Sequence, residues 1–152
     1  MLLVGNKKYK ILLASNSPRR KELLAGLGME YTVKVISDID ESFPDTLKGE
    51  EIPLYIARKK ADAYRQIIRP DELVITADTI VWLDGETLGK PENESAAVQM
   101  LHKLSGKTHQ VITGVCLTTN DWQRCFSSTT EVTFAVLTLE EIKSYVTNYH
   151  PF

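Results

Sequence analysis

Two arginines stand at the start of a predicted helix, directly after an apolar run and a stretch of small residues. The stretch reads LLASNSPRRKELL and covers residues 12–24. Free N–H groups at a helix N-terminus attract anions, and the hydroxyls of Ser15 and Ser17 add further donors. The guanidinium groups of Arg19 and Arg20 match phosphate oxygens. The same residues also fit a capped helix with two solvated arginines, so this stretch alone leaves both interpretations open.

An aspartate interrupts an apolar run, VITADTIV, at residues 74–81. A carboxylate in such a place is costly unless it is paired or bound to a metal. Sites in α/β sheets also form where strands end. Asp78 is therefore a candidate base or metal ligand. The commoner alternative, for this residue taken alone, is an aspartate that accepts hydrogen bonds from nearby backbone at a strand end.

Three further stretches carry charged residues that suit a phosphate substrate. DIDESFP, residues 38–44, holds Glu41 among oxygen-bearing side chains that can bind Mg²⁺ or Mn²⁺, or it is a solvated acidic loop. Lys59 and Lys60 are neighbours in a predicted helix and point about 100° apart, so one can face a site while the other faces water. Lys90, in LGKP, follows a predicted hairpin, where an exposed lysine is the commoner case. Basic donors, hard-metal carboxylates and a candidate base are together what a triphosphate site requires.

Composition and absent motifs exclude several classes of protein. The 152 residues suffice for one domain, the net charge of −2 argues against nucleic-acid binding, and no apolar run is long enough to span a membrane. The chain has no Walker loop, no GxGxxG and no GxSxG, and its histidines form no zinc-binding pair. Cys116 and Cys125 lack a metal-ligand spacing, so we expect thiols in a reducing cytoplasm.

Predicted strands and helices alternate along the chain, which indicates an α/β fold with a mixed sheet. Ser17, Pro18 and Gly28 mark the ends of the first helix, and Thr138 with Glu141 forms a capping box before the last one. The predicted helices cover residues 18–27, 54–68 and 95–104, followed by a helix from Thr138 onward. The predicted strands cover residues 10–14, 31–35, 73–83, 110–119 and 127–136.

The order of these motifs closely resembles the Maf family of nucleoside triphosphate pyrophosphatases, named for inhibition of septum formation. The motifs are ASNSPRRKELL, DESFP, ARKKA, ADTIV, LGKP and LSGKTHQVITGV. The resemblance runs from about Ile11 to the end of the chain. It implies one domain over residues 1–152, an elongated mixed sheet with helices on both faces, and two lobes around a central cleft, related to inosine triphosphate pyrophosphatases. It also implies a cytoplasmic homodimer that requires Mg²⁺ or Mn²⁺ and binds neither nucleic acid nor membranes.

The resemblance also assigns roles to individual residues. It implies that Asp78 accepts a proton from water and, with Glu41, binds the metal. Lys60 and Lys90 would act in catalysis. The substrate-binding residues would be Ser15, Ser17, Arg19, Arg20 and Thr79. Asp78, Glu41 and Lys90 together favour an enzyme over a non-catalytic, nucleotide-binding regulator of cell division.

Two positions bear on the substrate within this family. Arg19, after Ser-Pro, and Thr79, after the aspartate, resemble the subgroup that acts on dTTP and UTP. A bulky aromatic residue and a glutamine there would have indicated the subgroup that acts on 7-methyl-GTP. The expected reaction cleaves the triphosphate between its α- and β-phosphates. The family continues beyond the His150-Pro151 step, and we expect this chain, which ends at Phe152, to lack that C-terminal stretch.

Overall fold

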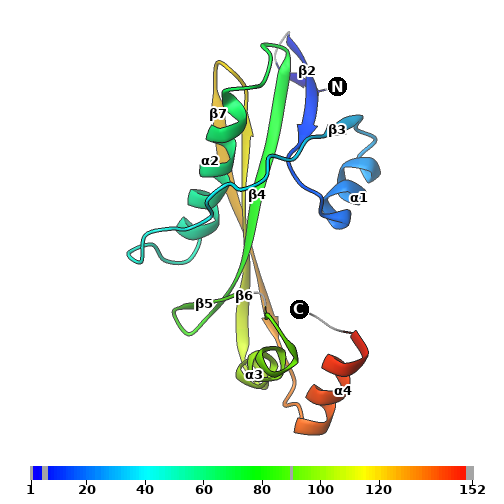
Figure 1. Ribbon diagram of the computed structural model, residues 1–152, viewed down its shortest axis with the longest axis vertical. Helices are drawn as coiled ribbons and strands as arrows, with labels where there is room; N and C mark the ends of the chain where they lie inside the picture. The colour runs from blue at the N-terminus through cyan, green and yellow to red at the C-terminus, as the bar shows by residue number, and fades with distance from the viewer. Residues whose placement is uncertain (1, 5–6, 90, 150–152) are drawn as a thin grey trace. The chain divides into compact units, whose positions relative to one another are not determined.

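The computed structural model describes residues 2–4, 7–89 and 91–149. The four helices in this part are α1 (Pro18–Gly26), α2 (Glu51–Arg65), α3 (Glu94–Leu104) and α4 (Leu139–Tyr149). The strands are β1 (Leu2–Val4), β2 (Lys7–Leu13), β3 (Tyr31–Val33), β4 (Glu72–Leu83), β5 (Glu86–Leu88), β6 (Thr108–Thr118) and β7 (Gln123–Thr133). The α/β class predicted from the sequence is therefore confirmed (Figure 1).

The described strands form one mixed sheet. Its main order is β1-β2-β4-β6-β7, with β3 paired to β2 and β5 paired to β4. β2 runs parallel to both β3 and β4, and the connections between these strands contain α1 and α2. β1 pairs antiparallel with β2, and β5 pairs antiparallel with β4 across a turn where Asp84 and Gly85 have positive φ. Asp-Gly is the dipeptide that this kind of hairpin turn favours.

The chain divides into two compact units. The first contains residues 1–79 and 113–128, and the second contains residues 80–112 and 129–152. All candidate site residues that the structure describes belong to the first unit. The prediction of one domain over residues 1–152 stays a prediction.

Packing of α2 on the sheet organises the first unit. Ala57 and Ala61 are fully buried beside Cys116, and Tyr64 packs with Leu12, Ile68 and Val74 in a second cluster. Gly114 of β6 lies directly under the first turn of α2. A Cβ atom there would stand 2.6 Å from the backbone of Pro53 and Leu54. Only glycine permits this approach, which brings β6 close to the start of α2.

The two cysteines are joined in a disulfide, so our expectation of thiols was wrong. The Thr119 N–H donates to the Trp122 carbonyl at 2.9 Å across the turn between β6 and β7. This register places Cys116 opposite Cys125, with Cα atoms 4.2 Å apart. The sequence prediction missed it because it began the strand at Ser127, whereas β7 begins at Gln123.

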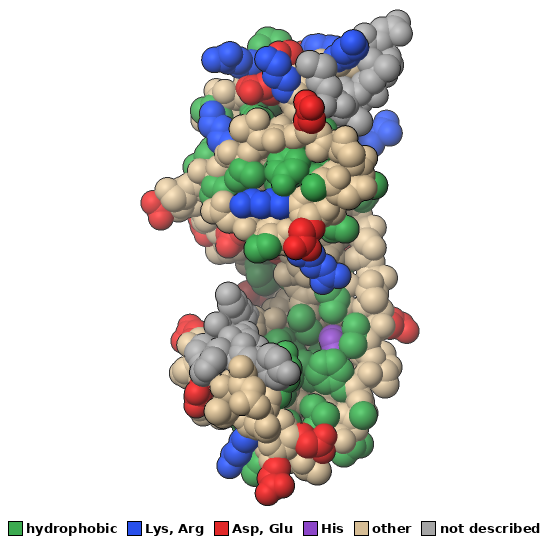
Figure 2. All heavy atoms as spheres, turned by 90° about the vertical axis from the view of Figure 1, so that its right-hand side faces the viewer, with side chains coloured by type: hydrophobic (Ala, Val, Ile, Leu, Met, Phe, Trp, Pro, Cys, Tyr) green, Lys and Arg blue, Asp and Glu red, His purple; other side chains and the backbone are tan. Residues whose placement is uncertain are grey.

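In the described part of the chain, no helix is both long and apolar enough to cross a membrane. Figure 2 shows one face of the molecule, on which basic and acidic side chains are interspersed instead of gathering into one basic patch. This distribution agrees with the net charge of −2.

Candidate functional site

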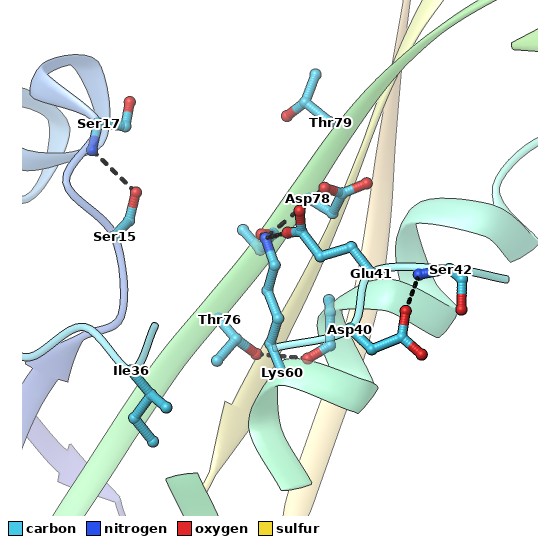
Figure 3. A network of polar contacts seen from close by, with 12 residues as sticks. Ser15, Ser17, Ile36, Asp40, Glu41, Ser42, Lys60, Thr76, Asp78 and Thr79 are labelled. Carbon is cyan, nitrogen blue, oxygen red and sulfur yellow. Dashed lines mark hydrogen bonds and ion pairs between the residues drawn. The ribbon is translucent and has the colours of Figure 1, made fainter. Parts of the chain in front are cut away.

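Lys60 lies between two carboxylates that come from different parts of the first unit. Its Nζ atom is 2.8 Å from Glu41 Oε1 and 3.7 Å from Asp78 Oδ1. It also donates a hydrogen bond to the Ala77 carbonyl oxygen at 3.0 Å. Figure 3 shows the carboxyl groups of Glu41 and Asp78 converging on this ammonium group. The structure thus brings together three residues that the sequence analysis selected separately.

The packing of α2 against β4 explains why Asp78 lies close to Lys60. Thr76 is buried in β4, and its hydroxyl donates to the Ala57 carbonyl of α2 at 2.8 Å. Residues two apart in a strand point to the same face, so Asp78 also faces α2. Lys60 lies almost one helical turn after Ala57 and therefore reaches the next part of the strand.

Opposing effects act on the pKa of Asp78. Burial raises the pKa because a low-dielectric environment disfavours the charged carboxylate. The positive charges of Lys60 and Arg20 lower it, and the nearby Glu41 raises it, with a net increase over the ordinary value. A partly buried carboxyl with specific charged neighbours is typical of functional sites.

A second group of contacts organises the loop before α1. The Ser17 N–H donates to Ser15 Oγ at 3.0 Å, and the Arg20 N–H donates to Ser17 Oγ at 3.5 Å as the predicted N-cap. The Arg20 guanidinium donates to Ser15 Oγ at 3.4 Å and to Thr79 Oγ1 at 3.3 Å. Arg20 therefore links the loop to the residue that follows Asp78. A helix N-terminus, two hydroxyls and a guanidinium form a suitable environment for phosphate oxygens.

One cavity connects the two groups of residues. Its volume is about 320 Å³, and its lining includes Ser15, Asn16, Arg20, Glu41 and Lys60. Lys60 and Arg20 supply positive charge to this cavity, and Glu41 supplies a carboxylate. The cavity lies wholly within the first unit. Its chemistry suits a multiply charged anion accompanied by a cation.

Arg19 and Arg20 are adjacent in the sequence, but they lie in different environments in the structure. Arg19 is exposed and, among the described residues, makes no hydrogen bond or ion pair, whereas Arg20 is half-buried. The predicted substrate role of Arg19 stays a prediction. The predicted role of Lys90 falls on a residue outside the described part of the chain. Thr113 of β6 also belongs to this group, since its hydroxyl lies 2.9 Å from that of Thr79, and it was not among the residues expected from the sequence.

The stretch that carries Glu41 has its own contacts with α2. Asp40 accepts from the backbone N–H of Ser42 at 2.9 Å and pairs with Lys59 at 3.1 Å. The Ser42 backbone N–H, then the Ser42 hydroxyl, and then Lys59 lower the pKa of Asp40 to about 2. Asp40 is thus held as a carboxylate, facing Lys59 and not Lys60. This pairing accounts for Lys59, which the sequence analysis left without a partner.

The carboxylates fit a divalent cation that binds together with substrate. Among the described residues, no three His, Cys, Asp or Glu side chains converge on a common point. Mg²⁺ commonly takes one or two carboxylates and completes its coordination with substrate phosphates and water. Glu41 and Asp78 supply two such carboxylates within reach of one ammonium group. The residues present therefore fit a shared Mg²⁺ or Mn²⁺ site and not a cage built from protein alone.

Replacing Arg20 with alanine is expected to weaken triphosphate binding by at least about tenfold, since hydrogen bonds to charged groups contribute about 1.5–3 kcal/mol. The salt dependence of the remaining affinity should also decrease, because fewer charges attract the ligand. Isothermal titration with a non-hydrolysable triphosphate at two salt concentrations measures both effects. Arg69→Ala is the matched control, because Arg69 is exposed and its side chain makes no hydrogen bond or ion pair with the described residues. Equal affinities for Arg20→Ala and the unchanged protein would contradict this role.

Comparison with known proteins shows the family to which this chain belongs. A family model described as "Maf-like protein" matches residues 10–152. A dTTP/UTP pyrophosphatase of Phocaeicola vulgatus is 67% identical over 99% of this chain and 78% of its own length. Proteins with the same name from Bacteroides fragilis and Porphyromonas gingivalis are 61% and 51% identical over 99% of this chain, covering 78% and 77% of their own lengths.

Solved structures support the fold. A nucleoside-triphosphatase, also named dITP/XTP pyrophosphatase, from Mycobacterium abscessus has a TM-score of 0.50 at 17% identity, covering 84% of this chain and 75% of its own. A HAM1 protein from Coxiella burnetii has a TM-score of 0.50 at 15% identity, covering 81% and 71%. At these identities, the likeness shows the shared fold alone.

Proposed function

This chain belongs to the Maf-like protein family, and we propose that it hydrolyses dTTP and UTP to the nucleoside monophosphate and pyrophosphate. The observation that carries the proposal is the group formed by Asp78, Lys60 and Glu41 beside a cavity that Ser15 and Arg20 also line. The names of relatives that are 51–67% identical support the same substrates.

In the proposed reaction, water attacks the triphosphate and the anhydride between the α- and β-phosphates breaks. Asp78 takes the proton that the attacking water loses, which requires the ionised carboxylate. Lys60 and Arg20 face the negative charge of the triphosphate, and their positions are set before substrate binds. Such preorganised charges stabilise a transition state without a cost of reorganisation during the reaction.

We include Mg²⁺ or Mn²⁺ in the proposal, held by Glu41 and Asp78 with phosphate oxygens of the substrate. When bound, the ion would neutralise phosphate charge and polarise the reacting anhydride. Ser15 and Ser17 would hold phosphate oxygens at the start of α1. The expected role of Lys90, as a further cation in catalysis, belongs to this proposal as well.

We base the proposed substrate preference on Thr79 and Arg19. Thr79 supports it by position: its hydroxyl lies between Arg20 and Thr113, next to Asp78 in the strand. A site that hydrogen-bonds a base rejects the wrong base strongly, because mismatched donors and acceptors lose their partners. Binding that relied on the triphosphate alone would not distinguish the bases.

We expect full-length protein to hydrolyse dTTP and UTP at least about tenfold better, in kcat/KM, than ATP and GTP. Pyrophosphate release with Mg²⁺ or Mn²⁺ measures this. Arg19→Trp combined with Thr79→Gln should erode the preference. Equal kcat/KM values for UTP and GTP in the unchanged protein would refute the substrate assignment, and absence of release from every triphosphate would refute the enzyme.

We further propose that the protein acts as a homodimer in the cytoplasm, where nucleoside triphosphates are hydrolysed and used. The resemblance to the Maf family supports both statements. Light scattering coupled to size-exclusion chromatography would give the mass of the particle in solution. A single monomeric species at micromolar concentration would refute the dimer.

A further inference from the structure

Neighbouring residues of a loop meet neighbouring lysines of α2 in a fixed register. Glu41 pairs with Lys60, whereas the residues on either side of it, Asp40 and Ser42, bind Lys59. Consecutive helical side chains diverge by about 100°, so the two lysines contact the loop from different directions. Figure 3 shows Asp40 directed away from the group that Glu41 and Lys60 form.

Lys59 contacts both residues that flank Glu41. Its Nζ atom is 3.1 Å from the Asp40 carboxylate, 3.1 Å from the Ser42 carbonyl oxygen and 3.5 Å from the Ser42 hydroxyl. Its ammonium group also lies 5.8 Å from the centre of the Tyr55 ring, one helical turn earlier on α2. A single side chain thus closes a small ring of contacts around the residue between Asp40 and Ser42.

The loop needs such a tether because it has no regular secondary structure from residue 34 to residue 50. The Ile36 N–H donates to the Tyr64 hydroxyl at 2.8 Å, and Ile39 packs against the cluster around Tyr64. These contacts hold the first half of the loop on α2. Lys59 holds the part of the loop that carries Glu41. The Glu41 side chain is more than half exposed.

The contacts of Lys59 are unsuited to stabilising the fold. The Asp40 side chain is 70% exposed, and ion pairs in such a position contribute little to the free energy of unfolding. They nevertheless fasten the two residues that flank Glu41, from whose backbone the Glu41 side chain projects. Groups that act on a reacting centre lose much of their effect when they are displaced by about 1 Å. The contribution of Lys59 should therefore appear in turnover and not in stability.

We propose that Lys59 is a positioning residue that, by binding Asp40 and Ser42, holds the Glu41 carboxylate against Lys60 in the orientation that the reaction requires. This inference rests on the proposed pyrophosphatase function. Lys59 itself touches neither substrate nor metal in this scheme. Its effect passes through the backbone of residues 40–42.

The test compares three variants of the full-length protein. Lys59→Met removes the tether and keeps the aliphatic part of the side chain. Lys59→Arg keeps a cation with several donors, which can still reach both partners. Arg58→Met is the matched control, because Arg58 is the preceding cation of α2, is exposed, and makes no hydrogen bond or ion pair with the described residues.

Amide hydrogen exchange of the ligand-free protein reports on the tether directly. We expect the peptide that covers residues 36–44 to exchange at least about tenfold faster in Lys59→Met and at the original rate in Lys59→Arg and Arg58→Met. The melting temperature should stay within about 2 °C in all three. Unchanged exchange in Lys59→Met would overturn the proposal.

Turnover of dTTP tests the consequence. Lys59→Met should lower kcat about tenfold, with KM changed by less than about twofold. Lys59→Arg should retain most of the kcat of the unchanged protein. An equal loss in Arg58→Met would overturn the proposal, because the effect would then follow net charge. If the unchanged protein hydrolysed no triphosphate, the proposed function would fail, while hydrogen exchange would still decide whether Lys59 holds the loop.

Discussion

Asp78→Asn is expected to lower kcat for dTTP and UTP by at least about 10², within the usual range for the loss of a general base. The amide has nearly the same shape as the carboxylate but cannot accept the proton from water at neutral pH. Binding of the triphosphate without a divalent cation should persist or strengthen, because a partly buried negative charge has been removed beside Lys60 and Glu41. Steady-state kinetics and isothermal titration with a non-hydrolysable analogue separate the two effects.

Asp62→Asn is the control for this substitution. It makes the same chemical change on the exposed surface of α2, and Asp62 makes no hydrogen bond or ion pair with the described residues. Its kcat should match that of the unchanged protein. Near-normal turnover by Asp78→Asn would rule out Asp78 as the base and would leave the carboxylate with at most a role in binding the cation.

Lys60→Met should lower kcat/KM by about 10²–10³, comparable to the removal of a preorganised donor from other active sites. The substitution takes away the ammonium group that holds Glu41 at 2.8 Å and lies 3.7 Å from Asp78. The two carboxylates then lose the cation between them. Lys48→Met, which removes an exposed lysine from the loop before α2, is the control and should change kcat/KM by less than about twofold.

The pH dependence gives this prediction a definite sign. Burial raises the pKa of Asp78 and Lys60 lowers it, so removing Lys60 should raise that pKa further. A general base works when ionised, and kcat/KM therefore declines as the pH falls through its pKa. The acid limb of the profile should move to higher pH in Lys60→Met. In Glu41→Gln, which removes a charge that raises the pKa, it should move to lower pH, and shifts in the same direction in both variants would contradict the assignment.

Local features were predictable because neighbouring residues create them. The Ser17 cap, the positive φ of Gly28 and the reciprocal hydrogen bonds of Thr138 and Glu141 all appear as the sequence indicated. Each depends on hydrogen bonds or backbone angles within a few residues, so no distant contact is needed to form it. The motif order also sufficed to identify the family, which the family model confirmed.

The convergence of the site depended on contacts between residues far apart in the chain. Asp78 was recognisable from the sequence as an unusual residue in an apolar run, but its partners were not. Glu41 reaches Lys60 only because the loop folds back onto α2, and Thr113 meets Thr79 only because β6 lies beside β4. Sequence spacing carries no information on such approaches until strand order and helix packing are known.

Arg19 and Arg20 show the same dependence on tertiary contacts. They are adjacent in the sequence, but Arg20 is half-buried and bonds Ser15 and Thr79, whereas Arg19 is exposed, because consecutive helical residues face different directions. The disulfide depends on strand register. Because the predicted strand began at Ser127 and β7 begins at Gln123, the sequence did not indicate that Cys116 lies opposite Cys125. The sequence by itself determined most of the elements, several of their caps, the family and the chemical types available. Tertiary structure decided which of those residues meet, because meeting depends on register and packing between segments that are distant in the chain.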